Sequence, residues 1–168
     1  MGYERAVREG AWIFQADSDE EMPPDHFRIL WEARADYDLL IGKRTCRAQT
    51  WDRKVISWCS RAWVRMLFGT GVDDDNTPYR LMRREPLSVL LALIPADTLA
   101  PNVILSGLFA KYRYRIYHTD VPFTVRRTGT VSLLKWGLWR FAIRACAQTI
   151  SAAVRAWRMK EVFNTRKS

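Results

Sequence analysis

A four-residue apolar run, Ala11-Trp12-Ile13-Phe14, is followed closely by two carboxylates, Asp17 and Asp19, and then by the pair Pro23-Pro24. Such a run is typical of a short β-strand, and the proline pair cannot continue it. The two carboxylates are therefore expected at the carboxyl end of a strand. In open α/β sheets ligands bind at this edge, and two close carboxylates repel each other there unless a cation lies between them.

The spacing Asp17-Ser18-Asp19 suits a hard divalent cation that bridges the carboxylates to phosphate oxygens. For any single Asp-x-Asp sequence, a solvated turn with an Asp at a helix cap is an alternative explanation. The strand before the motif and the prolines after it favour the metal site. No glycine-rich phosphate loop of either common pattern is present, so phosphate would be held by the metal and by arginines.

Hydrophobic periodicity predicts an alternation of helices and strands along the chain. Helices are expected over residues 3–9, 25–34, 52–68, 85–93 and 101–111, and strands over residues 11–16, 37–41, 79–82 and 114–119. An alternation of this kind predicts an α/β fold in which helices cover a sheet.

The segment from Leu133 to Phe163 has the pattern of one long amphipathic helix. Its arginines share a sector of about 60°, namely Arg140, Arg144, Arg155 and Arg158. A neighbouring face carries the large apolar side chains Trp136, Trp139, Ile143, Ile150, Val154 and Trp157. Basic helices that carry tryptophan bind membrane surfaces, while the charges interrupt any apolar run before the ~20 residues that a span needs. The alternative is that the tryptophan face packs against the rest of the protein.

The positive charge of the chain is concentrated near its carboxyl end. The formal net charge of the 168 residues is +9, but residues 1–110 hold 14 basic and 16 acidic side chains, a net charge of −2. Residues 111–168 hold 13 basic and 2 acidic side chains, a net charge of +11. This charge favours an anionic membrane surface as a partner. A basic nucleic-acid-binding module is a rival class, but it leaves the Asp-x-Asp motif and the acidic first part unexplained, so no nucleic acid is expected.

Three cysteines, Cys46, Cys59 and Cys146, are present without any Cys-x-x-Cys spacing. An odd number without that spacing supports neither a disulfide framework nor a zinc site. No signal peptide is visible at the charged, polar N-terminus, so a reducing cytoplasm is the expected compartment.

Five segments, in order, resemble motifs of family 2 glycosyltransferases, particularly the branch of dolichol-phosphate mannose synthase and bacterial polyprenyl-phosphate sugar transferases. Residues 17–24 resemble the metal-binding Asp-x-Asp segment, and residues 37–44 resemble the next strand, which ends in Gly-x-Arg. Residues 53–57 resemble an Arg-Lys-Ile-Ile-Ser helix start. Residues 74–81 resemble an Asp-x-x-Ser-Gly-Phe-Arg segment, and residues 121–129 resemble a Val-Pro-Phe strand followed by Arg and Gly.

The resemblance implies a metal-dependent, inverting transfer of a sugar from a nucleotide-sugar donor to a polyprenyl phosphate. It assigns the metal, Mg²⁺ or Mn²⁺, to Asp17, Asp19 and Glu21, although the branch carries Gln at the position of Glu21. It assigns the acceptor phosphate to Arg44 and Arg53. On the residues alone, these two arginines are equally well explained as solvated surface side chains.

The remaining site residues come from the later segments. The resemblance implies that Asp74 orients an arginine or acts as a base. It also implies that the donor diphosphate or the acceptor is bound by Ser57, Arg126 and Arg127. The alternatives are that Asp74 lies in a solvated turn and that part of the basic charge at Arg126 and Arg127 faces lipid headgroups.

The resemblance covers nearly the whole chain but only the later part of the family's catalytic domain. It implies that residues 1–132 form the C-terminal portion of a GT-A, Rossmann-like domain, and that residues 133–168 form basic amphipathic helices at the membrane interface and a tail. The family's βαβ unit for the nucleotide base has no counterpart, so the chain is either truncated or completed by another chain. The expected function is that of a partial glycosyltransferase, peripheral on the cytoplasmic face of the cell membrane, and an inactive membrane-associated remnant is the rival.

Overall fold

The computed structural model describes residues 2–17, 24–45, 62–69, 77–95, 97–122 and 135–165, with the backbone alone at residues 24, 44–45, 135–142 and 160–165. In chain order the elements are α1 (Gly2–Glu9), β1 (Trp12–Gln15), η1 (Pro24–His26), α2 (Phe27–Ala33), β2 (Leu39–Thr45), a helix at residues 62–68, β3 (Arg80–Arg83), α4 (Arg84–Leu91), α5 (Pro101–Lys111), β4 (Ile116–Pro122) and α6 (Lys135–Thr165).

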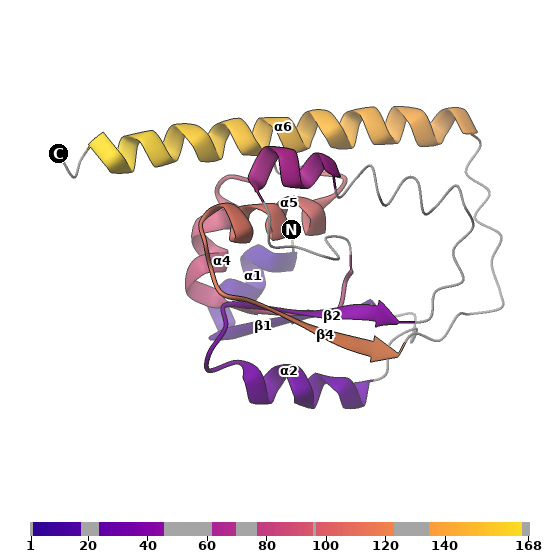
Figure 1. Cartoon of the computed structure of the whole chain (residues 1–168), viewed down its shortest axis with the longest axis vertical. Helices are drawn as coiled ribbons and strands as arrows, with labels where there is room; N and C mark the ends of the chain where they lie inside the picture. The colour runs from indigo at the N-terminus through magenta and orange to yellow at the C-terminus, as the bar shows by residue number, and fades with distance from the viewer. Residues whose placement is uncertain are drawn as a thin grey trace.

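The described elements are stacked in layers (Figure 1). The sheet lies between α2 on one face and α1, α4 and α5 on the other, and α6 lies across the outer side of α5. This arrangement confirms the α/β class that the alternation of helices and strands predicts.

The sheet has the order β1-β3-β2-β4. β3 runs antiparallel to both β1 and β2, while β2 and β4 pair in parallel. β1, β2 and β4 therefore point the same way, and their carboxyl ends meet the amino end of β3 at one edge. This is the type of edge at which open α/β sheets bind ligands.

Two apolar cores hold the layers together. The larger lies on the side of α4 and α5 and takes Leu39 and Ile41 from β2, while the smaller lies on the side of α2 and takes Leu40. Successive strand residues point to opposite faces. The continuous apolar run in β2 is therefore buried on both faces, as is typical of an interior strand covered on both sides.

The helix at residues 62–68 is fixed by a close approach to α5. A Cβ atom at Gly107 would lie 2.4 Å from Cδ2 of the buried Phe68 ring, which is too close for any larger residue without a shift. Gly69 follows the helix with a φ of 97°, a conformation that glycine adopts readily. The helix thus ends at Phe68, where the sequence predicts its end.

The predicted elements recur with shifted ends. The strand predicted over residues 37–41 begins at Leu39 and continues to Thr45, because it pairs with β4 as far as the register Thr45↔Pro122. The strand predicted over residues 114–119 likewise runs from Ile116 to Pro122. The helix predicted over residues 52–68 can be compared only over residues 62–68. The division of the chain at residue 132 stays a prediction.

Helix α6 is continuous from Lys135 to Thr165 and matches the predicted helix over residues 135–163, while residues 133–134 lie outside the described part. Its small side chains face inward, whereas Ile143, Ile150, Val154 and Trp157 are exposed. The alternative in which the tryptophan face packs against the protein is therefore wrong for these four side chains. No helix within the described residues combines the length and the apolar character needed to cross a membrane.

Candidate functional site

The candidate site is the sheet edge at which three carboxyl ends and one amino end meet. Asp17 follows β1 by two residues, and the backbone of Arg44 lies in the last part of β2, opposite Val121 of β4. Thr77 leads into β3 at the same edge. The parallel direction of β1, β2 and β4 thus brings Asp17 and Arg44, which are far apart in sequence, to one side of the sheet.

Asp17 is an exposed carboxylate at this edge. Within the described residues no ion pair is recorded for it, and no cluster of three acidic, histidine or cysteine side chains is present. Its two proposed co-ligands, Asp19 and Glu21, lie outside the described part. An exposed aspartate oxygen that follows a strand suits the hard cations Mg²⁺ and Mn²⁺, which take oxygen ligands.

A partly buried polar cluster near Asp17 ties α1 to the end of β1. The Tyr3 hydroxyl is within hydrogen-bonding reach of Gln15 Oε1 and lies 3.3 Å from Asn102 Oδ1 in α5. Burial raises the pKa of Tyr3, the Arg80 guanidinium opposes that shift, and the Asp17 carboxylate adds to it. The phenol therefore lies within electrostatic range of both the Arg80 guanidinium and the Asp17 carboxylate.

Arg80 is the largest fully buried side chain in the described residues. Its Nε and Nη2 donate to the Thr77 carbonyl at 3.0 and 2.7 Å, and its Nη1 donates to the Asn102 carbonyl at 3.1 Å and to Ser106 Oγ at 3.2 Å. A buried guanidinium is tolerated only when such bonds satisfy it. Arg80 thereby holds the segment before β3 against α5. β3 is the strand next to β1 in the sheet.

Sequence reasoning placed Arg80 in a motif but did not assign it to the site. The signal was available, because Tyr79-Arg80-Leu81-Met82 is a strand that is apolar except for one arginine. A charged side chain in an otherwise buried strand is rare unless it is paired or hydrogen-bonded.

Gly42 of the Gly-x-Arg sequence has a packing role. A Cβ atom there would lie 2.7 Å from Cδ1 of Tyr79 and 2.8 Å from Cγ2 of Val121. Its N–H donates to the Tyr79 carbonyl at 2.8 Å, and its carbonyl accepts from Thr77 Oγ1 at 2.9 Å. The absence of a side chain lets the segment before β3 lie against β2, and Arg44 follows two residues later.

The other predicted site residues cannot be placed. Outside the described residues lie Asp19, Glu21, Arg53, Ser57, Asp74, Arg126 and Arg127. The chain leaves the site edge after Thr45 and after Pro122, and it returns to that edge at Thr77. The grouping of these predicted site residues at the sheet edge therefore stays a prediction.

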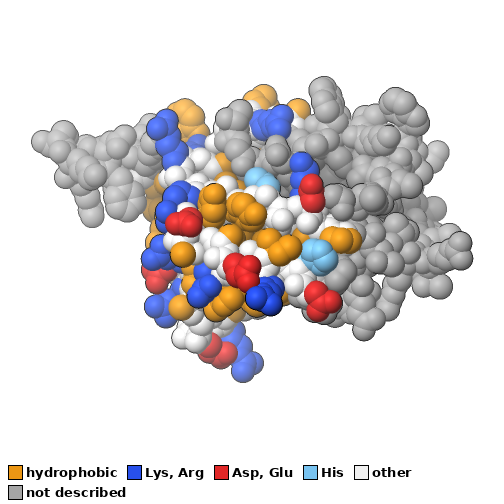
Figure 2. Space-filling view, turned by 60° about the horizontal axis from the view of Figure 1, so that its bottom comes forward, with side chains coloured by type: hydrophobic (Ala, Val, Ile, Leu, Met, Phe, Trp, Pro, Cys, Tyr) orange, Lys and Arg blue, Asp and Glu red, His pale blue; other side chains and the backbone are white. Residues whose placement is uncertain are grey.

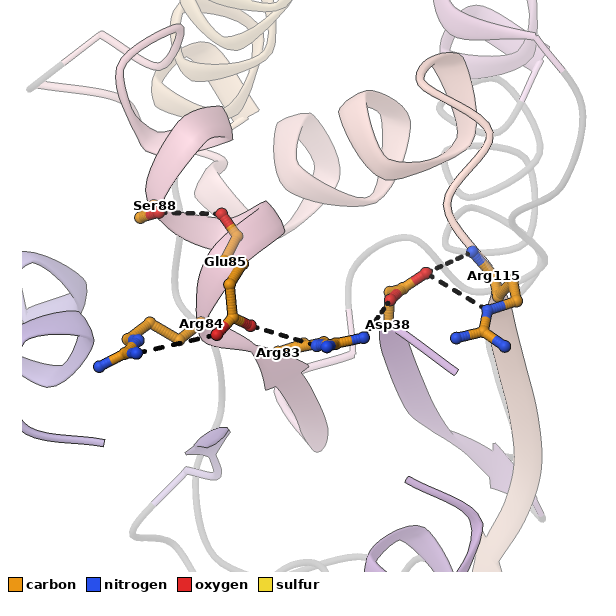
Figure 3. Close-up of polar contacts among 6 residues, drawn as sticks. All are labelled: Asp38, Arg83, Arg84, Glu85, Ser88 and Arg115. Atoms are coloured by element: carbon orange, nitrogen blue, oxygen red, sulfur yellow. Dashed lines mark hydrogen bonds and ion pairs between the residues drawn. The ribbon is translucent and has the colours of Figure 1, made fainter. Parts of the chain in front are cut away.

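The opposite end of the sheet carries an ion-pair network with a structural role (Figure 3). Asp38, before β2, accepts the Arg115 N–H at 3.0 Å and lies 3.6 Å from Arg83 and 3.7 Å from the Arg115 guanidinium. Arg83 also pairs with Glu85 at 3.1 Å. These charges join the amino ends of β2 and β4 to the carboxyl end of β3, away from the candidate site.

An aromatic cluster lies on the α2 side of β1. The Phe14 ring contacts the rings of Phe27 and Tyr79 with centroids 4.8 and 5.0 Å apart, and Phe27 stacks on Trp31 at 5.7 Å. Phe14 and Trp31 remain exposed, as does Ile29. Figure 2 shows hydrophobic side chains gathered on this face among charged ones.

Two curated proteins are similar to this chain at low identity. The undecaprenyl-phosphate mannosyltransferase of Micrococcus luteus is 26% identical over 144 residues, which cover 75% of this chain and 59% of the relative. The undecaprenyl-phosphate 4-deoxy-4-formamido-L-arabinose transferase of Proteus mirabilis is 27% identical over 104 residues, which cover 61% of this chain and 31% of the relative. No protein-family model matches.

These similarities support the resemblance to family 2 glycosyltransferases. Both relatives are, by name, sugar transferases of undecaprenyl phosphate. The chain spans less than two thirds of the length of either relative.

Proposed function

We propose that this chain is part of a GT-A-type sugar transferase that moves a sugar from a nucleotide-sugar donor to a polyprenyl phosphate at the cytoplasmic face of the cell membrane. The observation that carries the proposal is the position of Asp17. An exposed carboxylate follows β1 at this edge of the sheet, within electrostatic range of the partly buried Tyr3, which the buried Arg80 also influences. The names of the two relatives support the same chemistry.

In this proposal Asp17, Asp19 and Glu21 hold Mg²⁺ or Mn²⁺ through carboxylate oxygens. A metal bound there would neutralise the charge that builds on the departing diphosphate. The exposure of Asp17 leaves its carboxylate accessible to both the metal and the donor.

The proposed nucleophile is a phosphate oxygen of the acceptor, which is ionised at neutral pH and needs no strong general base. It bonds to the anomeric carbon opposite the departing diphosphate, so the configuration inverts. Arg44 and Arg53 are the proposed acceptor clamp, since a guanidinium binds phosphate through two parallel hydrogen bonds. Contact with phosphate is proposed for Ser57, Arg126 and Arg127. Orientation of an arginine is proposed for Asp74.

Arg80 and Tyr3 are proposed as positioning residues. Arg80 fixes the backbone at Thr77, three residues after Asp74, and Tyr3 fixes the Gln15 side chain, two residues before Asp17. Both tie the two segments to a rigid helix, α5, through Asn102. The segments that carry Asp17 and Asp74 would therefore keep a constant spacing.

A further polypeptide segment that binds the nucleotide base completes the proposal. β1 forms an edge of the described sheet, and its sequence Trp-Ile-Phe-Gln carries none of the charges or prolines that usually protect such an edge. Phe14 of β1 and Trp31 of the neighbouring helix α2 are exposed aromatic side chains. A strand added to β1 would extend the site and cover part of this apolar surface.

The metal site can be tested on the full chain with Mn²⁺ and inorganic pyrophosphate as probes. Titration calorimetry should show that Mn²⁺ strengthens pyrophosphate binding, and that Asp17→Asn weakens the metal-dependent part by about tenfold or more. Asp36→Asn is the matched control, because Asp36 is an exposed aspartate before β2, at the other end of the sheet. Equal binding by the chain and the Asp17 variant would refute the metal site.

The acceptor clamp is tested by transfer of a labelled sugar to polyprenyl phosphate in membranes, with the chain joined to the part of the Micrococcus luteus relative that it does not match. Arg53→Lys keeps the charge and loses the planar fork, so it should raise the KM for the acceptor much more than the KM for the donor. Equal increases in both would move Arg53 from the acceptor to a general structural or electrostatic role.

A further inference from the structure

Helix α6 carries an uncovered apolar stripe. The exposed fractions of Ile143, Ile150, Val154 and Trp157 are 67, 42, 45 and 62%. At about 100° per residue these four side chains fall within about 60° of one another around the helix axis. They form a line about 21 Å long on one side of the helix.

The orientation of the stripe is fixed by the packed side of α6, which is centred about 120° away around the helix axis. The buried residues there are small, namely Thr149, Ala152, Ala153 and Ala156. The Tyr112 hydroxyl donates to the Ala156 carbonyl at 3.1 Å, and Gln148 Oε1 accepts the Leu99 N–H at 2.9 Å. Small side chains let α6 approach α5 closely, so rotating the helix to bury the stripe would break these contacts.

Basic side chains flank the stripe on one side. Arg155 and Arg158 are exposed and lie about 60 to 120° around the axis from it. Arg144 lies on the same flank and pairs with Asp97 at 2.9 Å. Between residues 121 and 160 the chain has eight basic residues and no acidic residue.

We propose that this outward face of α6 docks on an anionic lipid bilayer, with the stripe in the interface and the arginines among the headgroups. Charge complementarity favours this occupant, because a basic stretch of this length without one acid repels another copy of itself. The single straight line of apolar side chains suits a flat surface better than a protein groove. Trp157 has the amphipathic ring that favours the headgroup region, and Lys111 Nζ lies 4.7 Å from its centroid.

The docked orientation also has a consequence for the site, which rests on the proposed function. In Figure 1, α6 runs along the direction of the strands and begins on the side toward which β2 and β4 point. With α6 flat on the bilayer, the candidate site would open sideways along the membrane plane. A lipid-linked phosphate held in the same leaflet would then reach it by lateral diffusion.

Docking is tested with the full chain and vesicles that contain no polyprenyl phosphate and no sugar nucleotide, so the result is independent of the transfer chemistry. Flotation should show binding to vesicles of phosphatidylcholine with phosphatidylglycerol, and much weaker binding to phosphatidylcholine alone. Ile143→Gln with Ile150→Gln should weaken binding by about tenfold or more. Val89→Gln is the matched control, because Val89 is an exposed apolar residue of α4.

Arg155→Ser with Arg158→Ser tests the electrostatic part of the binding, which should weaken and become less sensitive to salt. Circular dichroism and urea unfolding check that the variants keep the fold. Binding that is unchanged in the isoleucine variant, or equal on neutral and anionic vesicles, would overturn the proposal. So would sedimentation showing a dimer that the isoleucine variant dissociates, because the stripe would then be a contact between copies.

Discussion

Arg80→Lys is the substitution that most directly tests the buried cluster. It keeps the positive charge in the core but replaces a guanidinium that makes four hydrogen bonds to Thr77, Asn102 and Ser106. A lysine ammonium is a single point donor, so it cannot serve the Thr77 carbonyl on one side and α5 on the other. The variant should therefore leave at least one buried acceptor without a partner.

The magnitude follows from those bonds. An unsatisfied buried acceptor costs about 1–3 kcal/mol, and a lost hydrogen bond to a charged group costs about 1.5–3 kcal/mol. Part of this is regained by the remaining ammonium contact, so the free energy of unfolding should fall by about 2–4 kcal/mol. Such a change would remove a large fraction of the stability of a typical domain.

Arg83→Lys is the matched control, because it changes the same residue type in the same strand. The side chain of Arg83 is 45% exposed and pairs with Glu85 and Asp38. An exposed pair of this kind contributes about 0–1 kcal/mol. Urea unfolding monitored by fluorescence and circular dichroism gives both values, provided that the slopes agree. Equal losses in the two variants would show that the hydrogen bonds of Arg80 do not stabilise the fold.

Burial raises the pKa of Tyr3, so its stabilising contribution is complete below about pH 10 and is lost as the pH rises through the higher folded value. Urea unfolding of Tyr3→Phe should therefore show a smaller fall in stability across that alkaline range. Gly107→Ala should cost about 1–3 kcal/mol in thermal unfolding despite better helix propensity, and Phe68→Leu should reduce that cost in a double-mutant cycle. Asp38→Asn removes ion pairs with two arginines, Arg115 among them, and should cost more at low salt than at high salt in denaturant titrations.

The strands and the end of β1 could be predicted from the sequence because each depends on local pattern. The apolar run before Asp17 predicts a strand, and Asp17 does lie at its carboxyl end. The position of β3 between β1 and β2 could not be predicted in this way. Strand order depends on contacts across the chain, such as Gln15↔Arg80 and Arg80↔Ile41, and no local pattern encodes them.

The same limit applies to α6 and to Arg80. Helical periodicity identifies an apolar face and a basic face, but it does not show that Ala152 and Ala156 are the residues that pack. Close approach to α5 selects the small side chains, and this leaves Trp157 outside. For Arg80, the strand pattern reveals an unusual charge, whereas its acceptors at Thr77 and Asn102 become visible only in the folded chain.

The open edge of β1 gives a prediction about turnover. Asp17 is an exposed carboxylate at the described edge, and in the proposed function it would contact the diphosphate through a metal. A contact of that kind is weak and unselective without recognition of the base. We therefore expect little transfer of sugar by the chain alone. Adding the part of the Micrococcus luteus relative that this chain does not match should raise turnover and should slow hydrogen exchange of the β1 amides. Rapid turnover by the chain alone, or a gain in turnover without protection of β1, would show that this edge is not where the site is completed.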